Sequence, residues 1–197
     1  MNEQKEISFD LDPRVITALA EEYSDYKVVV EFANAISGRK TAEVEPLARR
    51  IFEPFGEKWM KRSLELGDEY PDHTYDVIKA AAEKTKAIAF PHIPQRALEI
   101  AYIGSKGIRL LRIIENSPHR LVYRLNECPT YVALCDRCGQ NVANMISCRY
   151  ACLAACQTLK AELNLEVNVE MEASTNEDGF CQFVMSKVIR TISTGIK

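Results

Sequence analysis

The stretch from residue 165 to residue 172 reads LEVNVEME, a strict alternation of apolar and polar side chains. Successive side chains of a β-strand point to opposite faces, so this period of two predicts a half-exposed strand over 165–171. Residues 174–179 are a polar turn signal, and residues 180–189 then predict a returning strand. This hairpin decides the fold class, because it places antiparallel strands in a chain whose first half has helical spacing.

A second hairpin is predicted before this one, with strands over 107–114 and 120–125 on either side of an Asn-Ser-Pro turn. Between the two hairpins, the spacing of apolar residues predicts a short helix that ends at Gly139 and a longer helix over 145–163. The longer helix carries cysteines along its length. Both hairpins are therefore expected to pack against a cysteine-rich helix.

The first half of the chain has apolar residues at helical spacing. Asp12 and Pro13 favour a helix start, and the pattern predicts one helix that reaches residue 36. A second helix is expected over 41–67, with Pro54 ending or kinking it. The other expected features are a loop over 67–72, a helix capped by Asp72, a break over 90–94, and a short helix over 95–103 ended by Gly104.

This order of helices, hairpin, helix and hairpin predicts an α+β fold with an antiparallel sheet. We expect one domain over 1–197, made of a helical subdomain over 1–104 and a cysteine-rich α+β subdomain over 105–197. The amphipathic helices and the exposed sheet edges need further cover, which predicts a homodimer.

The composition excludes several classes of function. The net charge is -3 and no basic stripe is interleaved with aromatic residues, which argues against nucleic-acid binding. No apolar run approaches the roughly 18 residues that a membrane helix needs. The first residues are acidic where a signal peptide would be basic, so we expect a cytoplasmic protein that does not bind membranes. An odd count of 7 cysteines then favours reduced thiols over a disulfide framework.

The cysteines are the least ordinary feature of the sequence. Most of them gather in one short segment, and one follows in the last hairpin: Cys128, Cys135, Cys138, Cys148, Cys152, Cys156 and Cys181. Thiolates bind zinc and iron–sulfur clusters, so these are the cofactors that such a segment would hold. Cys135 and Cys138 have the two-residue spacing of a metal knuckle and are followed by Gly139.

Cys148, Cys152 and Cys156 recur every four residues, which puts them on one face of the predicted helix. This face could line a site or could simply face the core, because a free cysteine behaves as a small apolar residue. For Cys152 and Cys156 we favour burial. Cys148 lies near the expected helix start, where the helix dipole lowers the pKa of a thiol.

The segment from Cys128 to Met185 has the order of elements of a known family. Its markers are Cys128-Pro129, Cys148 at a helix start, Glu170, and the GFCQF ending over 179–183. In these features it resembles the L-2-amino-thiazoline-4-carboxylic acid hydrolase-like family. The resemblance implies hydrolysis of a cyclic carbon–nitrogen bond in a small molecule such as a thiazoline carboxylate. Cys148 and Glu170 are then the expected catalytic residues, with Cys148 as nucleophile or metal ligand and Glu170 as base or metal ligand.

The same ending is also similar to 4-vinyl-reductase-type ligand-binding domains, in which such residues bind zinc near a pocket. Cys148, Glu170 and Cys181 match three of the zinc ligands, whereas Ala173 stands where those domains have a cysteine. The alternative function is therefore a non-catalytic module that binds a small ligand, zinc or an iron–sulfur cluster. The candidate metal ligands are Cys128, Cys135, Cys138, Cys148 and Cys181. Strand and helix lengths predict that Cys148, Glu170 and Cys181 meet at one end of the hairpin.

Overall fold

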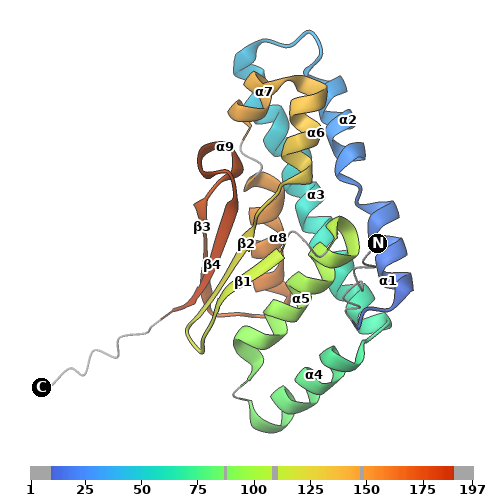
Figure 1. Ribbon diagram of the computed structural model, residues 1–197, viewed down its shortest axis with the longest axis vertical. Coiled ribbons are helices and arrows are strands. Elements are labelled where there is room, and N and C mark those ends of the chain that lie inside the picture. The colour runs from blue at the N-terminus through green and yellow to red at the C-terminus, as the bar shows by residue number, and fades with distance from the viewer. Residues whose placement is uncertain (1–9, 87, 108–110, 147–148, 189–197) are drawn as a thin grey trace, which may run out of the picture.

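The computed structural model describes residues 10–86, 88–107, 111–146 and 149–188, and it confirms the α+β class (Figure 1). The N-terminal half is helical, and the sheet comes from the second half. In chain order the elements are α1 (Pro13–Glu22), α2 (Asp25–Ile36), α3 (Thr41–Glu69), α4 (His73–Thr85), α5 (Ala89–Lys106), β1 (Leu111–Asn116), β2 (Arg120–Leu125), α6 (Pro129–Cys138), α7 (Gln140–Met145), α8 (Arg149–Glu162), β3 (Val167–Ala173), α9 (Thr175–Asp178) and β4 (Cys181–Lys187).

The sheet has four antiparallel strands in the order β1-β2-β4-β3. Its central pair, β2 and β4, places Tyr123 opposite Phe183 and Leu125 opposite Cys181. These four side chains are buried on the face that packs against α5 and α8. The predicted strand over 165–171 is observed as β3, two residues further along, and its alternation of side chains is as expected.

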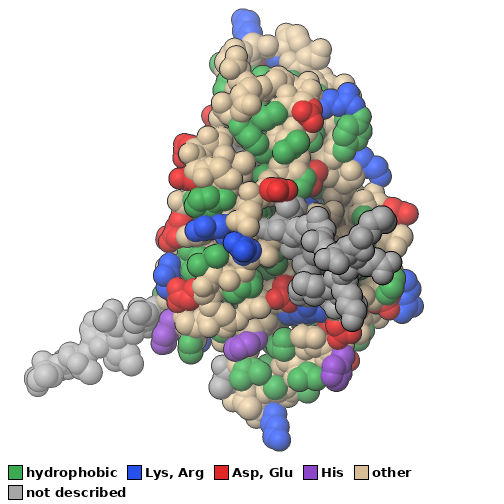
Figure 2. Space-filling model, in the orientation of Figure 1, with side chains coloured by type: hydrophobic (Ala, Val, Ile, Leu, Met, Phe, Trp, Pro, Cys, Tyr) green, Lys and Arg blue, Asp and Glu red, His purple; other side chains and the backbone are tan. Residues whose placement is uncertain are grey.

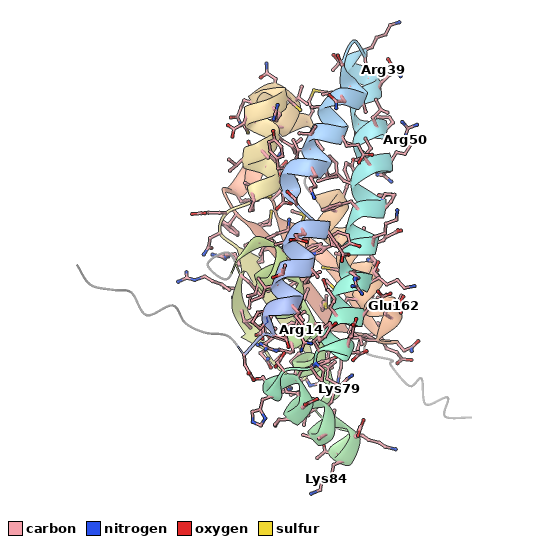
Figure 3. All side chains as sticks on the ribbon, turned by 90° about the vertical axis from the view of Figure 1, so that its right-hand side faces the viewer. Arg14, Arg39, Arg50, Lys79, Lys84 and Glu162 are labelled. Atoms are coloured by element: carbon pink, nitrogen blue, oxygen red, sulfur yellow. The ribbon has the colours of Figure 1, made fainter. Side chains whose placement is uncertain are left out.

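The helices α3 and α8 lie in close contact along one side of the molecule. A Cβ atom added to Gly56 would lie 2.0 Å from the backbone oxygen of Ala151, so only glycine lets the backbones approach this closely. Figure 3 shows α2 and α3 running side by side along the long axis, with Arg39 and Arg50 pointing away from the helices. Acidic and basic side chains are interspersed on the face drawn in Figure 2.

The core is formed jointly by the helical half and the sheet. One buried cluster joins Trp59 and Tyr102 of the helices to Tyr123, Cys156 and Phe183. A second cluster fills the space between α2, α3, α6 and α7. Within the described ranges, no helix is both long enough and apolar enough to cross a membrane.

The single helix expected from Asp12 to residue 36 is wrong, because the chain breaks between Glu22 and Asp25. Ser24 adopts an extended conformation, with φ -71° and ψ 123°. The break lets the two helices take different directions: α1 packs on α5 and α3, whereas α2 packs on α6 and α3. The cap by Asp12 is confirmed, since its carboxylate accepts the backbone N–H of Arg14 at 2.8 Å.

Pro54 does not end the second helix, which runs as α3 through both Pro46 and Pro54 to Glu69. Both prolines are exposed, so the carbonyls that lose an internal partner can reach water. The buried side of α3 packs along α8 and holds the helix together. The expected loop over 67–72 is correspondingly shorter. The cap by Asp72 is confirmed, because it accepts the backbone N–H of Tyr75 at 2.9 Å.

A break was expected over 90–94, and the structure has a kink at Phe90, inside α5. Phe90 has φ -114° and ψ 136°, its bond to Pro91 is cis, and the helix then continues to Lys106. Gly104 does not end this helix. It is buried where α5 meets α1, and a Cβ there would lie 2.6 Å from the Cδ1 atom of Leu19. The helix ends instead at Gly107, which has a positive φ of 88°.

The long helix expected over 145–163 is observed as α8, which begins at Arg149 and ends at Glu162. Ile146 is extended, with φ -96° and ψ 110°, and it separates α7 from α8. Residues 147 and 148 lie outside the described ranges. The polar turn expected over 174–179 contains the one-turn helix α9. The short helix predicted to end at Gly139 is confirmed as α6.

Candidate functional site

The structure places Glu170 and Cys181, two of the three residues that the sequence proposed for one site, on opposite faces of the sheet. Cys148 lies outside the described residues. Cys181 is buried at the start of β4, on the inner face of the sheet. Glu170 is exposed on β3 and pairs across the sheet with Val184, so its side chain projects from the opposite face. The structure therefore does not bring Glu170 together with Cys181.

The cysteines proposed as metal ligands also divide between two regions. Cys128 belongs to the cluster beneath the sheet, whereas Cys135 and Cys138 pack at the edge of the cluster between α2, α3, α6 and α7. Among the residues that the structure describes, no three cysteine, histidine or acidic side chains are grouped so that they could hold a metal ion. The described residues therefore show no grouping for the zinc ion that the resemblance implies or for the iron–sulfur cluster that the cysteine spacing suggests, and Cys148, which belongs to both proposed ligand sets, lies outside the described ranges.

A different set of residues meets where three helix ends converge. Asp25 is the first residue of α2, Lys106 is the last residue of α5, and Thr130 lies in the first turn of α6. The Lys106 ammonium contacts the Asp25 carboxylate, and the Thr130 hydroxyl donates to the same carboxylate oxygen at 2.5 Å. Only 6% of the Lys106 side chain and 11% of the Asp25 side chain are exposed. We call these three residues the charged junction.

The helix ends explain why this junction is stable. A carboxylate is favoured at the N-terminus of α2 and an ammonium at the C-terminus of α5, because each faces the opposite charge of the helix dipole. Burial by itself lowers the pKa of Lys106, but Asp25 and the nearby thiols of Cys152 and Cys128 outweigh it, so the pKa is raised. Lys106 therefore remains an ammonium ion inside the protein. Its Nζ atom also lies 5.0 Å from the centre of the Trp59 ring.

Cys128 is the thiol that lies at the start of α6, next to this junction. It is the N-cap residue, and its sulfur accepts the backbone N–H of Tyr131 at 3.4 Å. Pro129 follows at the first helical position, which is a common helix start. The positive end of the helix dipole and the Lys106 ammonium both favour negative charge on this sulfur. The helix start and Lys106 thus give this sulfur two neighbours of positive charge.

Cys152 lies between this thiol and the sheet. It is buried on α8 and is electrostatically coupled to Lys106, Cys128 and Cys181. Burial raises the pKa of Cys152 far above its usual value, and the Lys106 ammonium offsets only part of that effect. The Cys181 sulfur is 3.0 Å from the Thr175 hydroxyl. Cys152 is therefore a neutral thiol, and it lies between the charged junction and the sheet.

Cys156, one helical turn further along α8, lies in an aromatic environment. Its sulfur is 2.9 Å from the hydroxyl of Tyr123, whose ring stacks on Phe183. Burial raises the pKa of Cys156 to about 12, despite the hydrogen bond with Tyr123. This thiol keeps its proton at neutral pH and packs as part of the core.

A surface depression of about 330 Å³ lies beside the charged junction. Its lining includes the chain neighbours of Asp25 and Cys128, and the whole set is Tyr26, Glu127, Pro129, Val132, Ala133, Asp136 and Arg137. Tyr26 and Val132 are more than half exposed, and the Arg137 guanidinium lies 4.8 Å from the centre of the Tyr26 ring. The lining residues Glu127 and Pro129 flank Cys128 in the chain, whereas Cys128 itself is buried.

Sequence reasoning did not find Asp25 and Lys106, which are 81 residues apart in the chain. The only local signals are an acidic residue in a first helical turn and a lysine in a last turn, and both are common on solvated helices. Comparison of the chain with protein families, with curated proteins and with solved structures finds no match. The family resemblance therefore remains a prediction.

Proposed function

We propose that the chain is a hydrolase that opens a cyclic carbon–nitrogen bond in a small molecule, with Cys128 as the nucleophile. The observation that supports this best is the buried Asp25–Lys106 pair beside a thiol that caps a helix N-terminus. A thiol is a good nucleophile only as its thiolate, and an adjacent cation and helix N-terminus are what stabilise that form. Cys148 and Glu170 give way to Cys128 and Asp25 in this assignment.

The proposed reaction has two steps. The Cys128 sulfur attacks the ring carbon of an amidine or amide, and its proton passes through Asp25 to the ring nitrogen. Lys106 stabilises the negative charge that develops on the atom attached to that carbon. The carbon–nitrogen bond then breaks, which leaves an acyl group on sulfur from an amide or an imidoyl group from an amidine. Water hydrolyses this thioester or thioimidate, releases the opened product and restores the thiol.

The second candidate is a binding module that holds a small ligand without turnover. It is supported by the burial of the thiols, since Cys128 is 6% exposed and Cys152 is 7% exposed. Buried thiols of this kind suit binding better than rapid exchange of substrate and product. The two candidates share the charged junction and differ in whether a covalent intermediate forms.

The test uses a panel of cyclic amidines and lactams that carry a carboxylate, including a 2-aminothiazoline-4-carboxylate. The protein is mixed with each compound, quenched in acid, digested and mapped by mass spectrometry. We expect an acyl adduct on the Cys128 peptide and release of the opened product. The Cys128→Ser variant should lose both, whereas the Cys156→Ser variant should keep both.

Binding of a compound without adduct or product would favour the second candidate instead. Turnover that persists in Cys128→Ser would contradict the assignment of the nucleophile. We also propose a cytoplasmic location, because reduced thiols are needed for this chemistry. The homodimer stays a prediction, which light scattering at micromolar concentration can test.

A further inference from the structure

Two exposed apolar side chains line the depression beside the charged junction. Tyr26 on α2 is 53% exposed and Val132 on α6 is 56% exposed. Pro129 and Ala133 complete the apolar part of the lining, and we call these four residues the α2–α6 patch. Figure 2 shows hydrophobic side chains on the surface over α2 and α6. Single exposed apolar residues are ordinary, whereas several that gather in one depression mark an interaction surface.

Charged side chains of both signs lie around this patch. Glu127 precedes α6, whereas Asp136 and Arg137 lie in its last turn, and all three are exposed and line the same depression. Among the described residues, none of the three has an ion-pair partner, and Arg137 instead lies over the Tyr26 ring. A rim of one sign would fit a partner of the opposite charge. A rim that carries both signs can instead fit a second copy of itself.

The positions of these charges along α6 suit a two-fold contact. Val132 lies five residues after Glu127 and five residues before Arg137 in the chain. If α6 of a second copy packs antiparallel about an axis at Val132, Glu127 of each copy lies beside Arg137 of the other. Antiparallel packing also brings the positive end of each helix dipole next to the negative end of the other. A parallel contact would place like charges together, so the antiparallel one is favoured.

We propose that two copies of this chain associate through the α2–α6 patch, by antiparallel contact of their α6 helices with Val132 at the centre. The sequence predicts a homodimer without saying which face forms it, and this proposal assigns the face and the pairing of Glu127 with Arg137. It does not rest on the proposed function. Because the patch has only four apolar residues in each copy, the interface is small, and we expect a transient dimer that forms at micromolar concentration.

The first experiment measures the dimer dissociation constant by sedimentation velocity over micromolar concentrations. Val132→Asp should raise this constant by about 10-fold or more, as the loss of a central interface side chain does. The matched control is Val77→Asp, because Val77 is 53% exposed on α4, outside the patch, and its substitution should leave the constant unchanged. Circular dichroism confirms that both variants are folded. A wild type that stays monomeric, or equal effects of the two variants, would overturn the proposal.

The second experiment tests the pairing by exchanging charges. Arg137→Glu and Glu127→Arg should each raise the dissociation constant by about 10-fold, because like charges then meet twice across the axis. An equimolar mixture of the two variants should associate nearly as well as the wild type, since both contacts again join opposite charges. These differences should shrink at high salt. A mixture that associates no better than either variant alone, or single variants that associate like the wild type, would overturn the proposed pairing.

Discussion

Cys128 and Cys156 are both buried, and each sulfur has a hydrogen-bond partner, yet their surroundings differ in kind. Cys128 caps a helix beside a buried ammonium, whereas Cys156 lies among aromatic rings with a tyrosine hydroxyl as its polar neighbour. Burial favours the neutral thiol in both places. Of the two, Cys128 alone has a cation and a helix N-terminus that oppose this effect, so we attribute the reactivity proposed for Cys128 to charge placement and not to burial.

The largest expected effect comes from removing the ammonium that makes the two regions different. Lys106→Met keeps the length of the side chain but leaves Asp25 buried without its cation. Breaking a buried ion pair in this way costs about 3–5 kcal/mol. Urea unfolding should show that loss in Lys106→Met and a partial recovery in the double variant Lys106→Met/Asp25→Asn. A loss below about 1 kcal/mol in Lys106→Met would mean that the junction is not the stabilising element described here.

A smaller loss is expected in the aromatic region. Cys156→Ala removes the partner of the Tyr123 hydroxyl and leaves a small cavity, which together should lower the free energy of unfolding by about 2 kcal/mol. The matched control is the double variant Cys156→Ala/Tyr123→Phe, which no longer leaves the hydroxyl unpaired. Its loss should be smaller than the sum of the two single losses. If the loss in the double variant equals the sum of the two single losses, the 2.9 Å contact does not contribute to stability.

At alkaline pH, the titration of Cys156 should lower the stability of the protein. Its pKa rises from an ordinary 9.0 to about 12 in the folded protein. Below about pH 9 both folded and unfolded states keep the proton, and above it the unfolded state loses its proton first. The free energy of unfolding should therefore fall by about 1.4 kcal/mol per pH unit from this group as pH rises toward about 12.

Cys156→Ala should show a correspondingly shallower loss of stability over the same pH range, measured by urea unfolding at each pH. The slopes of the two proteins should coincide below about pH 9, where the thiol is protonated in both states. Parallel slopes above that pH would show that Cys156 is not held in its neutral form by the fold.

The smallest expected effect is at the edge of the charged junction. Thr130→Val keeps the shape of the side chain and removes the hydrogen bond to Asp25, which should cost about 1 kcal/mol in thermal or urea unfolding. Thr175→Val, which removes the hydroxyl near Cys181, is a matched comparison outside the junction. If Thr130→Val is as stable as the wild type, the contact does not help to hold Asp25, at the start of α2, against the start of α6.

The fold was predictable where a single segment carries the signal. The alternation over 165–172 predicts β3, and Asp72 and Gly139 mark helix ends where the structure has them. The same alternation also puts Glu170 on the face opposite Val169, so the strand pattern itself argues against a site shared with Cys181. The helix α3 continues past Pro46 and Pro54 because it packs along α8. That contact cannot be predicted from the sequence around the prolines.

The candidate site was only partly predictable, for a related reason. Cys128-Pro129 stands out in the sequence, and its place as a helix cap follows from local rules. Asp25 and Lys106 give no such signal, because their meaning comes from contact across 81 residues of chain. The break between α1 and α2 is what places Asp25 at a helix start, and it was not expected from the apolar spacing.

The most direct test of the central claim measures alkylation of Cys128 and Cys156 in the same sample. Folded protein is treated with limiting iodoacetamide at pH 7.5, and the modified fraction of each peptide is followed by mass spectrometry. We predict that Cys128 reacts at least about 100-fold faster than Cys156, since only the thiolate reacts. The double variant Lys106→Met/Asp25→Asn should slow Cys128 by about 10-fold or more, as loss of a neighbouring cation lowers the thiolate fraction. Equal rates for the two cysteines, or an unchanged Cys128 rate in the variant, would contradict the account.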